Sequence, residues 1–135
     1  MEPVLEAKKI RKVYGTRSNL YPAINDISFE VAHGEFISVM GPSGAGKSTL
    51  LNVLSSIDKP TSGEVKISGV DLFEMKARDL AVFRRDRLGF IFQDYNLLDT
   101  MSLKDNITMP LSLSRTPVAE IEERFEKNFA GVWNL

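Results

Sequence analysis

The stretch "SVMGPSGAGKSTLLNVL", Ser38 to Leu54, joins the end of an apolar run to a glycine-rich segment and a helical pattern. The apolar run, residues 35–40, is nearly continuous, which predicts a strand covered on both faces, as in a parallel sheet. The glycines of residues 41–46 predict a loop, and the apolar spacing of residues 47–57 predicts a helix. A strand–loop–helix unit of this kind indicates an α/β fold.

The loop matches the pattern G-x-x-x-x-G-K-[ST] at every fixed position. Glycines let backbone N–H groups turn inward to phosphate oxygens, and the start of the following helix adds a positive dipole end. Lys47 supplies a full charge to the terminal phosphates, and the Ser48 hydroxyl suits Mg²⁺, so Ser48 is a candidate metal ligand. The predicted triphosphate site comprises Gly41, Pro42, Ser43, Gly44, Ala45, Gly46, Lys47, Ser48 and Thr49, with Lys47 as a catalytic candidate.

The patterning before this unit predicts an antiparallel layer that is solvated on one face. Val4 to Tyr14 alternate loosely and predict an edge-type strand, and the polar residues Gly15 to Pro22 predict a loop. Alternating apolar residues from Ile27 onward predict a half-buried strand that ends in the turn His33-Gly34. His33 is therefore interpreted as a surface turn residue.

The patterning after the unit predicts two further strands and three helices. The predicted strands cover residues 64–68 and 89–93, the second of them buried. The predicted helices cover residues 75–88, Leu103–Leu113 and Pro117–Val132, with Thr116 as N-cap of the last. The arginines of "RRDR" (residues 84–87) are interpreted as a solvated helix face or a surface that faces a protein partner, and not as a nucleic-acid patch.

Composition narrows the function classes. The 135 residues include no cysteine, which excludes disulfides, thiolate metal sites and cysteine nucleophiles. The net charge of -1 gives no reason to expect a nucleic-acid partner. No apolar run approaches the roughly 20 residues of a membrane span, so we expect no direct membrane insertion.

Two further stretches narrow the class of nucleotide-binding protein to which the chain is compared. "KVYG" ends a predicted strand with Tyr14, and "LGFIFQDYNLL" ends another with Gln93. Together with "GPSGAGKST" they make the chain resemble the nucleotide-binding domain of ABC transporters over essentially all of its length. The resemblance implies that Tyr14 stacks on adenine, and that Gln93 contacts Mg²⁺ and the attacking water as a catalytic and metal-site residue. The implied cofactors are ATP and Mg²⁺.

Within that family, the stretch from Arg84 to Leu111 looks like the branch of lipoprotein-release, macrolide-efflux and bacitracin-resistance ATPase subunits. The resemblance implies a bacterial ATPase that couples ATP hydrolysis to transport or export, including export of antimicrobial peptides. It also implies a membrane permease as partner, a head-to-tail homodimer in the intact protein, and a cytoplasmic location at the inner face of the cell membrane.

The family's later motifs are not found in this sequence: the Leu-Ser-Gly-Gly-Gln signature, the apolar strand ending in Asp-Glu, and the switch histidine. We therefore expect residues 1–135 to be one C-terminally truncated domain, with a core over 1–95 and the start of a helical subdomain over 96–135. The expected fold class is α/β of the P-loop NTPase type. It has a mostly parallel sheet and an N-terminal antiparallel layer, and the later strands and most of the helical subdomain are absent.

We expect the chain alone to bind ATP with little turnover. Two alternatives remain open at this point. One is a small P-loop kinase that uses the arginines of residues 84–87 near its acceptor. The other is a non-hydrolysing nucleotide-binding fragment that docks a partner.

Overall fold

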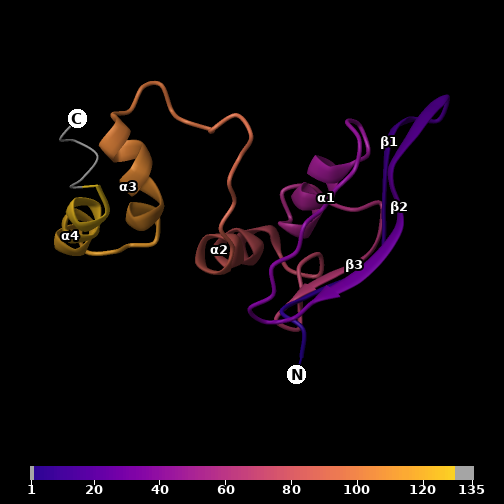
Figure 1. Cartoon of the computed structure of the whole chain (residues 1–135), viewed down its shortest axis with the longest axis horizontal. Coiled ribbons are helices and arrows are strands. Elements are labelled where there is room, and N and C mark those ends of the chain that lie inside the picture. The colour runs from indigo at the N-terminus through magenta and orange to yellow at the C-terminus, as the bar shows by residue number, and fades with distance from the viewer. Residues whose placement is uncertain (1, 130–135) are drawn as a thin grey trace. The chain divides into compact units, whose positions relative to one another are not determined.

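The computed structural model describes residues 2–129, and the chain divides into two compact units between Arg84 and Arg85 (Figure 1). Each unit is described by itself. The prediction of a core over 1–95 and a helical subdomain over 96–135 stays a prediction.

The first unit contains an antiparallel sheet in the order β2-β1-β3-β4. Its strands are β1 (Leu5–Thr16), β2 (Asn19–Val31), β3 (Ser62–Ile67) and β4 (Val70–Asp71). The predicted antiparallel layer is confirmed, but β1 lies between β2 and β3 and is not an edge strand. The predicted loop over residues 15–22 is also wrong, because the β1–β2 ladder continues to Thr16 and Asn19. Pro22 is tolerated there because β2 is the edge strand, where a missing N–H leaves no ladder partner unsatisfied.

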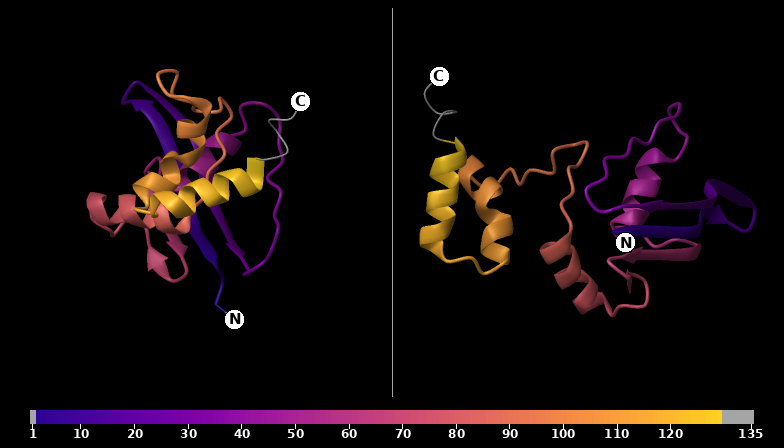
Figure 2. Two further views of the ribbon diagram at one scale, coloured as in Figure 1. Left: turned by 90° about the vertical axis from the view of Figure 1, so that its left-hand side faces the viewer. Right: turned by 60° about the horizontal axis from the view of Figure 1, so that its bottom comes forward.

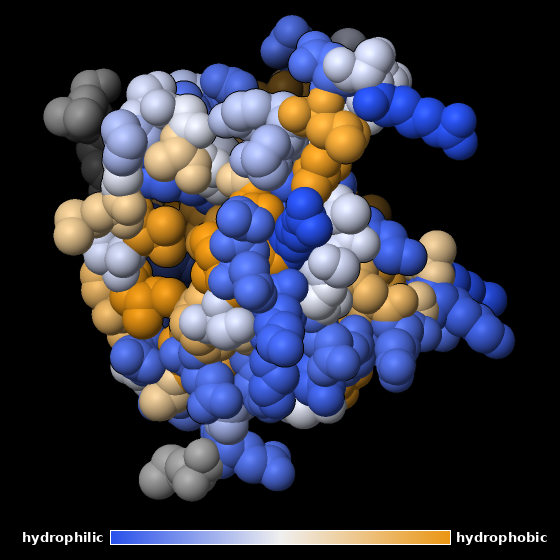
Figure 3. All heavy atoms as spheres, turned by 90° about the vertical axis from the view of Figure 1, so that its right-hand side faces the viewer, coloured by the Kyte–Doolittle hydropathy of each residue, from blue (hydrophilic) through white to orange (hydrophobic). Residues whose placement is uncertain are grey.

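The core of this unit lies between the sheet and helix α1 (Lys47–Leu54), which packs against one face of the sheet (Figure 2). Hydrophilic side chains gather over the strands on the side shown in Figure 3. The sheet is therefore half-buried, as the alternating sequence pattern predicts. The buried apolar residues of this unit are Ala7, Ile10, Ile24, Val31, Leu50, Val53, Leu54, Val65, Ile67 and Leu72.

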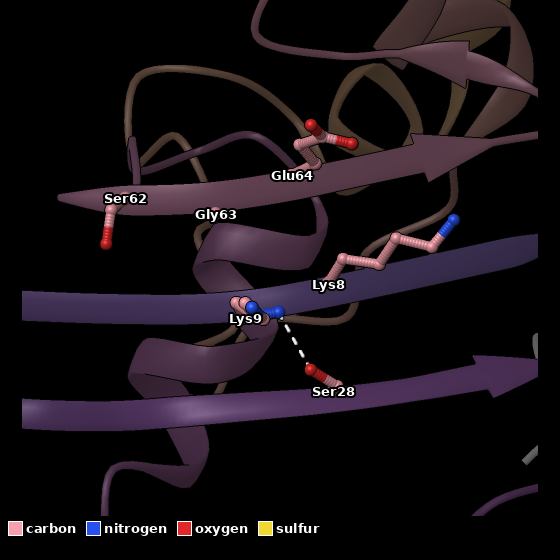
Figure 4. Close-up of a pocket in the computed structure, with 6 residues that line it drawn as sticks. All are labelled: Lys8, Lys9, Ser28, Ser62, Gly63 and Glu64. Atoms are coloured by element: carbon pink, nitrogen blue, oxygen red, sulfur yellow. Dashed lines mark hydrogen bonds between the residues drawn. The ribbon is translucent and has the colours of Figure 1, made fainter.

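The sheet face seen in Figure 4 carries a shallow pocket at an irregularity of the ladder. The register shifts between Lys8 and Arg11, and Lys9 has a φ of 49°. Its N–H donates to Ser28 Oγ at 2.8 Å instead of to a strand carbonyl. Gly63 allows the close approach, because a Cβ there would lie 2.4 Å from the Lys9 carbonyl oxygen. The pocket thus follows from a β-bulge.

The predicted parallel strands are not formed. Residues 35–40 and 89–93 have no strand structure, and most of them are exposed. Phe36 is 93% exposed and Ile91 is 98% exposed. A strand needs hydrogen-bonded neighbours, and the described ladders pair β1 to β4 only with one another. Burial of these runs was predicted from their apolar character alone, which says nothing of whether neighbours are present.

The remaining elements are helices. Helix α2 (Ala77–Arg87) contains the division between the units, and the second unit holds α3 (Leu103–Leu113) and α4 (Val118–Phe129). The prediction for α3 is confirmed at both ends; Ser102 caps it by accepting the Asp105 N–H at 3.1 Å. The predicted helix over 117–132 is confirmed as α4, although residues 130–132 lie outside the described part of the chain.

Helices α3 and α4 pack through Ile121, which is buried, and the ring of Phe125, which lies under the Lys104 ammonium at 5.3 Å. Lys104 also forms an ion pair with Glu122. None of the helices in residues 2–129 is both long and apolar enough to cross a membrane.

Candidate functional site

The glycine-rich loop closes onto strand β2. Gly44 and Gly46 have φ values of 80° and 90°, in the left-handed region that favours glycine. A Cβ on Gly46 would lie 2.2 Å from the Ala23 carbonyl oxygen, so no side chain fits at this position. Gly46 is also the N-cap of α1, and the Leu50 N–H donates to its carbonyl at 2.8 Å. The glycine thus sets both the approach to β2 and the start of the helix.

The Lys47 side chain folds back over this loop. Its ammonium donates to the Gly41 and Pro42 carbonyl oxygens, each at 2.7 Å. A tight turn completes the loop, in which the Ala45 N–H donates to Pro42 at 3.2 Å. The ammonium thus lies among the carbonyl oxygens of the loop.

The start of α1 is open to an anion. No side chain caps Gly46, and the first turn of the helix carries no acidic residue. The N–H groups of a first helical turn have no partner within the helix, and they stand at its positive end. Ser48 in this turn is exposed, whereas Lys47 and Thr49 are half-buried. Backbone donors, an ammonium and a hydroxyl therefore meet at one helix terminus.

The Ser48 hydroxyl fits a magnesium site of the kind that is completed by phosphate oxygens and waters. Within residues 2–129 no cluster of three or more His, Cys, Asp or Glu residues could hold a metal. The second predicted metal-site residue, Gln93, lies in an exposed turn of the other unit. The structure therefore brings Ser48, Lys47 and the loop together, and the role of Gln93 stays a prediction.

Tyr14 reaches the loop–helix unit from β1. Its hydroxyl donates to Asp58 Oδ2 at 2.7 Å, and 41% of the residue is exposed. The hydrogen bond to Asp58, reinforced by burial, raises the pKa of the Tyr14 hydroxyl, while the Thr49 side chain in α1 acts in the opposite direction. The structure thus places the predicted base-stacking residue against Asp58, in the segment that follows α1.

Tyr21 contacts the glycine-rich loop, which the sequence did not predict. It is the register partner of Tyr14 across the β1–β2 hairpin, and its hydroxyl donates to the Gly44 carbonyl at 3.2 Å. Lys12 and Asp58 were also missed. Lys12 precedes Tyr14 by two positions and so shares its face of the strand, which is a signal that the sequence does carry. No local signal indicates Asp58.

The comparisons with known proteins identify the family of the chain. The family model described as ABC transporter matches residues 24–133. The chain belongs to the ABC transporter family. The predicted resemblance to ABC transporters is confirmed. The predicted fold class is confirmed by the similarity to solved ABC cassettes given below, although the strands in residues 2–129 pair only in antiparallel fashion.

Among curated proteins, the bacitracin export ATP-binding protein BceA of Halalkalibacterium halodurans is 50% identical over 124 residues. That match covers 92% of this chain and 49% of BceA. The ABC transporter ATP-binding protein YxdL of Bacillus subtilis is 48% identical, over 100% of this chain and 53% of YxdL. The chain thus spans about half the length of these curated relatives.

Two solved structures of the ATP-binding cassette MJ0796 are similar to the chain. A dimeric structure, described as a bacterial ABC transporter cassette, has a TM-score of 0.84 and 33% identity, covering 91% of this chain and 54% of the cassette. A post-hydrolysis state bound to ADP and Pi has a TM-score of 0.82 and 34% identity, covering 89% and 53%. Binding of ATP or ADP by this part of the fold is supported by the family match and by the ADP-bound structure.

Proposed function

We propose that the chain is the ATP-binding part of an ABC transporter ATPase subunit, which couples ATP binding and hydrolysis to movement of a substrate through a membrane permease. The observation that carries this is the Lys47 ammonium, held at the Gly41 and Pro42 carbonyls beside the uncapped start of α1. In this arrangement the ammonium and the first-turn N–H groups take the triphosphate, and Ser48 takes Mg²⁺.

The same proposal assigns roles to two residues outside the glycine-rich loop, Tyr14 and Gln93. Tyr14 stacks on adenine, and Gln93 contacts Mg²⁺ and the attacking water. The relative named as a bacitracin export protein supports an export function, with antimicrobial peptides as candidate cargo. The dimeric MJ0796 cassette supports a homodimer, and the family name supports a permease partner at the inner face of the cell membrane.

A P-loop kinase is less well supported. It needs free arginines near the phosphoryl acceptor, but the Arg84 guanidinium donates to the Ser56 carbonyl at 2.8 Å. Arg85 forms an ion pair with Asp86 at 2.7 Å. These contacts do not remove the arginines from use, and Arg87 is a third; the family match over residues 24–133 is what favours a transporter ATPase over a kinase.

The test combines thermal unfolding with phosphate release. A ligand at about 100 times its Kd that binds only the folded chain stabilises it by about 2.7 kcal/mol. We expect Mg-ATP to raise the Tm of the chain, and Lys47→Ala to lose the shift. Arg78→Ala, a charge removed from an exposed position of α2, is the matched control and should keep the shift. An equal shift in Lys47→Ala would refute the proposed site, and transfer of phosphate to a metabolite would favour the kinase.

A further inference from the structure

Three residues form a polar cluster at the outer end of the site, which we call the Asp58 cluster: Lys12, Tyr14 and Asp58. Asp58 uses both carboxylate oxygens, accepting from the Lys12 ammonium with Oδ1 and from the Tyr14 hydroxyl with Oδ2, each at 2.7 Å. The Lys12 ammonium also lies 4.8 Å from the centroid of the Tyr14 ring. Each member of the cluster therefore contacts the other two.

Asp58 is held in place by bonds that do not involve Tyr14. Its own N–H donates to the Asn52 carbonyl of α1 at 3.1 Å. The following residues are fastened to β1, because the Lys12 ammonium donates to the Lys59 carbonyl at 2.7 Å and the Val13 N–H donates to Thr61 Oγ1 at 2.9 Å. The carboxylate is thus a fixed acceptor that the tyrosine must meet.

The chemistry of the cluster keeps this acceptor charged. Only 12% of the Lys12 side chain and 32% of the Asp58 side chain are exposed, so water screens their ion pair less than a pair at the open surface. A phenol that donates to an ionised carboxylate makes a stronger hydrogen bond than one between neutral groups. The hydroxyl of Tyr14 therefore has one strongly preferred position.

Fixing the hydroxyl also restricts the ring. An exposed tyrosine explores several side-chain rotamers, and binding to its ring must overcome the entropy lost when one is selected. In the Asp58 cluster the hydroxyl is bound and a cation lies over the ring, while 41% of the residue stays accessible. The ring is thus oriented before any ligand arrives, and the cation occupies one of its two faces.

We propose that Asp58 is a positioning residue that holds the Tyr14 ring as the stacking surface for the base of a nucleoside triphosphate. This rests on the proposed function, in which the loop binds the triphosphate and Tyr14 takes the base. Asp58 then contributes only to the part of the affinity that depends on the base. The phosphate contacts of Lys47 and of the start of α1 do not depend on it.

The experiment compares Mg-ATP with magnesium tripolyphosphate, which has the phosphates without the base. Titration calorimetry on the full chain measures both affinities for the wild type, Asp58→Ala, Tyr14→Phe and the double variant. We expect each single variant to weaken ATP binding about threefold to tenfold, a fraction of the stacking contribution. The ratio of ATP to tripolyphosphate affinity should therefore fall, and the double variant should be no weaker than the single ones.

Matched variants separate the positioning effect of Asp58 from the effect of its charge and from a loss of folding. Removal of any negative charge raises the affinity for both anionic ligands. Glu64→Ala on β3 removes such a charge away from Tyr14, so it is the control and should leave the ratio of the two affinities unchanged. If Asp58→Ala does not fold, Asp58→Asn replaces it, because the amide keeps an acceptor oxygen for the Tyr14 hydroxyl. Asp58→Asn should then keep most of the wild-type ratio of ATP to tripolyphosphate affinity, whereas Tyr14→Phe should not.

The outcomes distinguish the two proposals. If the wild type binds both ligands and the ratio is unchanged in Asp58→Ala and Tyr14→Phe, the positioning role is overturned and the proposed function stands. Additive losses in the double variant also overturn the positioning role, because Asp58 would then act by another route. If the wild type binds neither ligand, the proposed function fails, and the role of Asp58 fails with it.

Discussion

Tyr14 and Tyr21 are register partners across the β1–β2 hairpin, and their hydroxyls donate to the segments that follow and precede α1. Tyr14 donates to Asp58, which follows the helix, and Tyr21 donates to the Gly44 carbonyl in the loop that precedes it. One cross-strand pair therefore connects the antiparallel sheet to both sides of the loop–helix unit. The sheet thus helps to shape the phosphate loop as well as covering the core.

Tyr21→Phe tests the connection to the loop. Because Tyr21 is 56% exposed, removal of its hydroxyl in Tyr21→Phe should change the free energy of unfolding from that of the wild type by no more than about 0.5 kcal/mol. The loop loses a bond that helps to fix Gly44, and ATP and tripolyphosphate affinities should both fall about twofold to threefold. Tyr95→Phe, at a residue 83% exposed in the second unit, is the control and should change neither. A loss confined to ATP would contradict this role.

Gly46→Ala and Gly44→Ala form a matched pair of loop variants. Both glycines have φ in the left-handed region, which costs a residue with a side chain about 1–2 kcal/mol. Only at Gly46 does a Cβ also meet the Ala23 carbonyl, at 2.2 Å, whereas at Gly44 it meets nothing within 4 Å. Urea unfolding should therefore show a loss of about 1 kcal/mol for Gly44→Ala and about 3 kcal/mol or more for Gly46→Ala. Equal losses would mean that the loop moves away from β2 at little cost.

The sequence predicted the features that local chemistry decides. The loop over residues 41–46 follows from motif spacing, and the start of α3 follows from the Ser102 cap, so neither needed knowledge of distant residues. The runs at 35–40 and 89–93 were wrong as strands because pairing depends on neighbours elsewhere in the chain. The contact between Tyr14 and Asp58 joins residues 44 positions apart, which no periodicity in a single sequence can reveal.

Stability should depend on pH through Asp58. The hydrogen bond from Lys12, followed by that from Tyr14, lowers the pKa of the Asp58 carboxyl in the folded chain. Its contribution is present above the unfolded pKa of about 3.9 and is lost as the pH falls through the lower folded value. Asp58→Asn should therefore be less stable than the wild type by about 1 kcal/mol at neutral pH, and the difference should shrink below a pH of about 4. Urea unfolding over a pH series measures both, and a difference independent of pH would contradict the assignment.

The Tyr14 hydroxyl should titrate above its ordinary range. Its hydrogen bond to the Asp58 carboxylate, with burial as the second cause, favours the neutral phenol and raises its pKa from the ordinary value near 10.0. The protonated, neutral phenol is the form that donates to Asp58. Its contribution to the free energy of unfolding is therefore present below the unfolded pKa and is lost as the pH rises through the folded pKa. The absorbance of tyrosinate in the wild type minus that in Tyr14→Phe isolates this group from the other tyrosines. Asp58→Asn should bring the isolated transition to lower pH, because the amide carries no negative charge to oppose ionisation. A transition that stays in place in Asp58→Asn would mean that burial, and not the carboxylate, controls the hydroxyl.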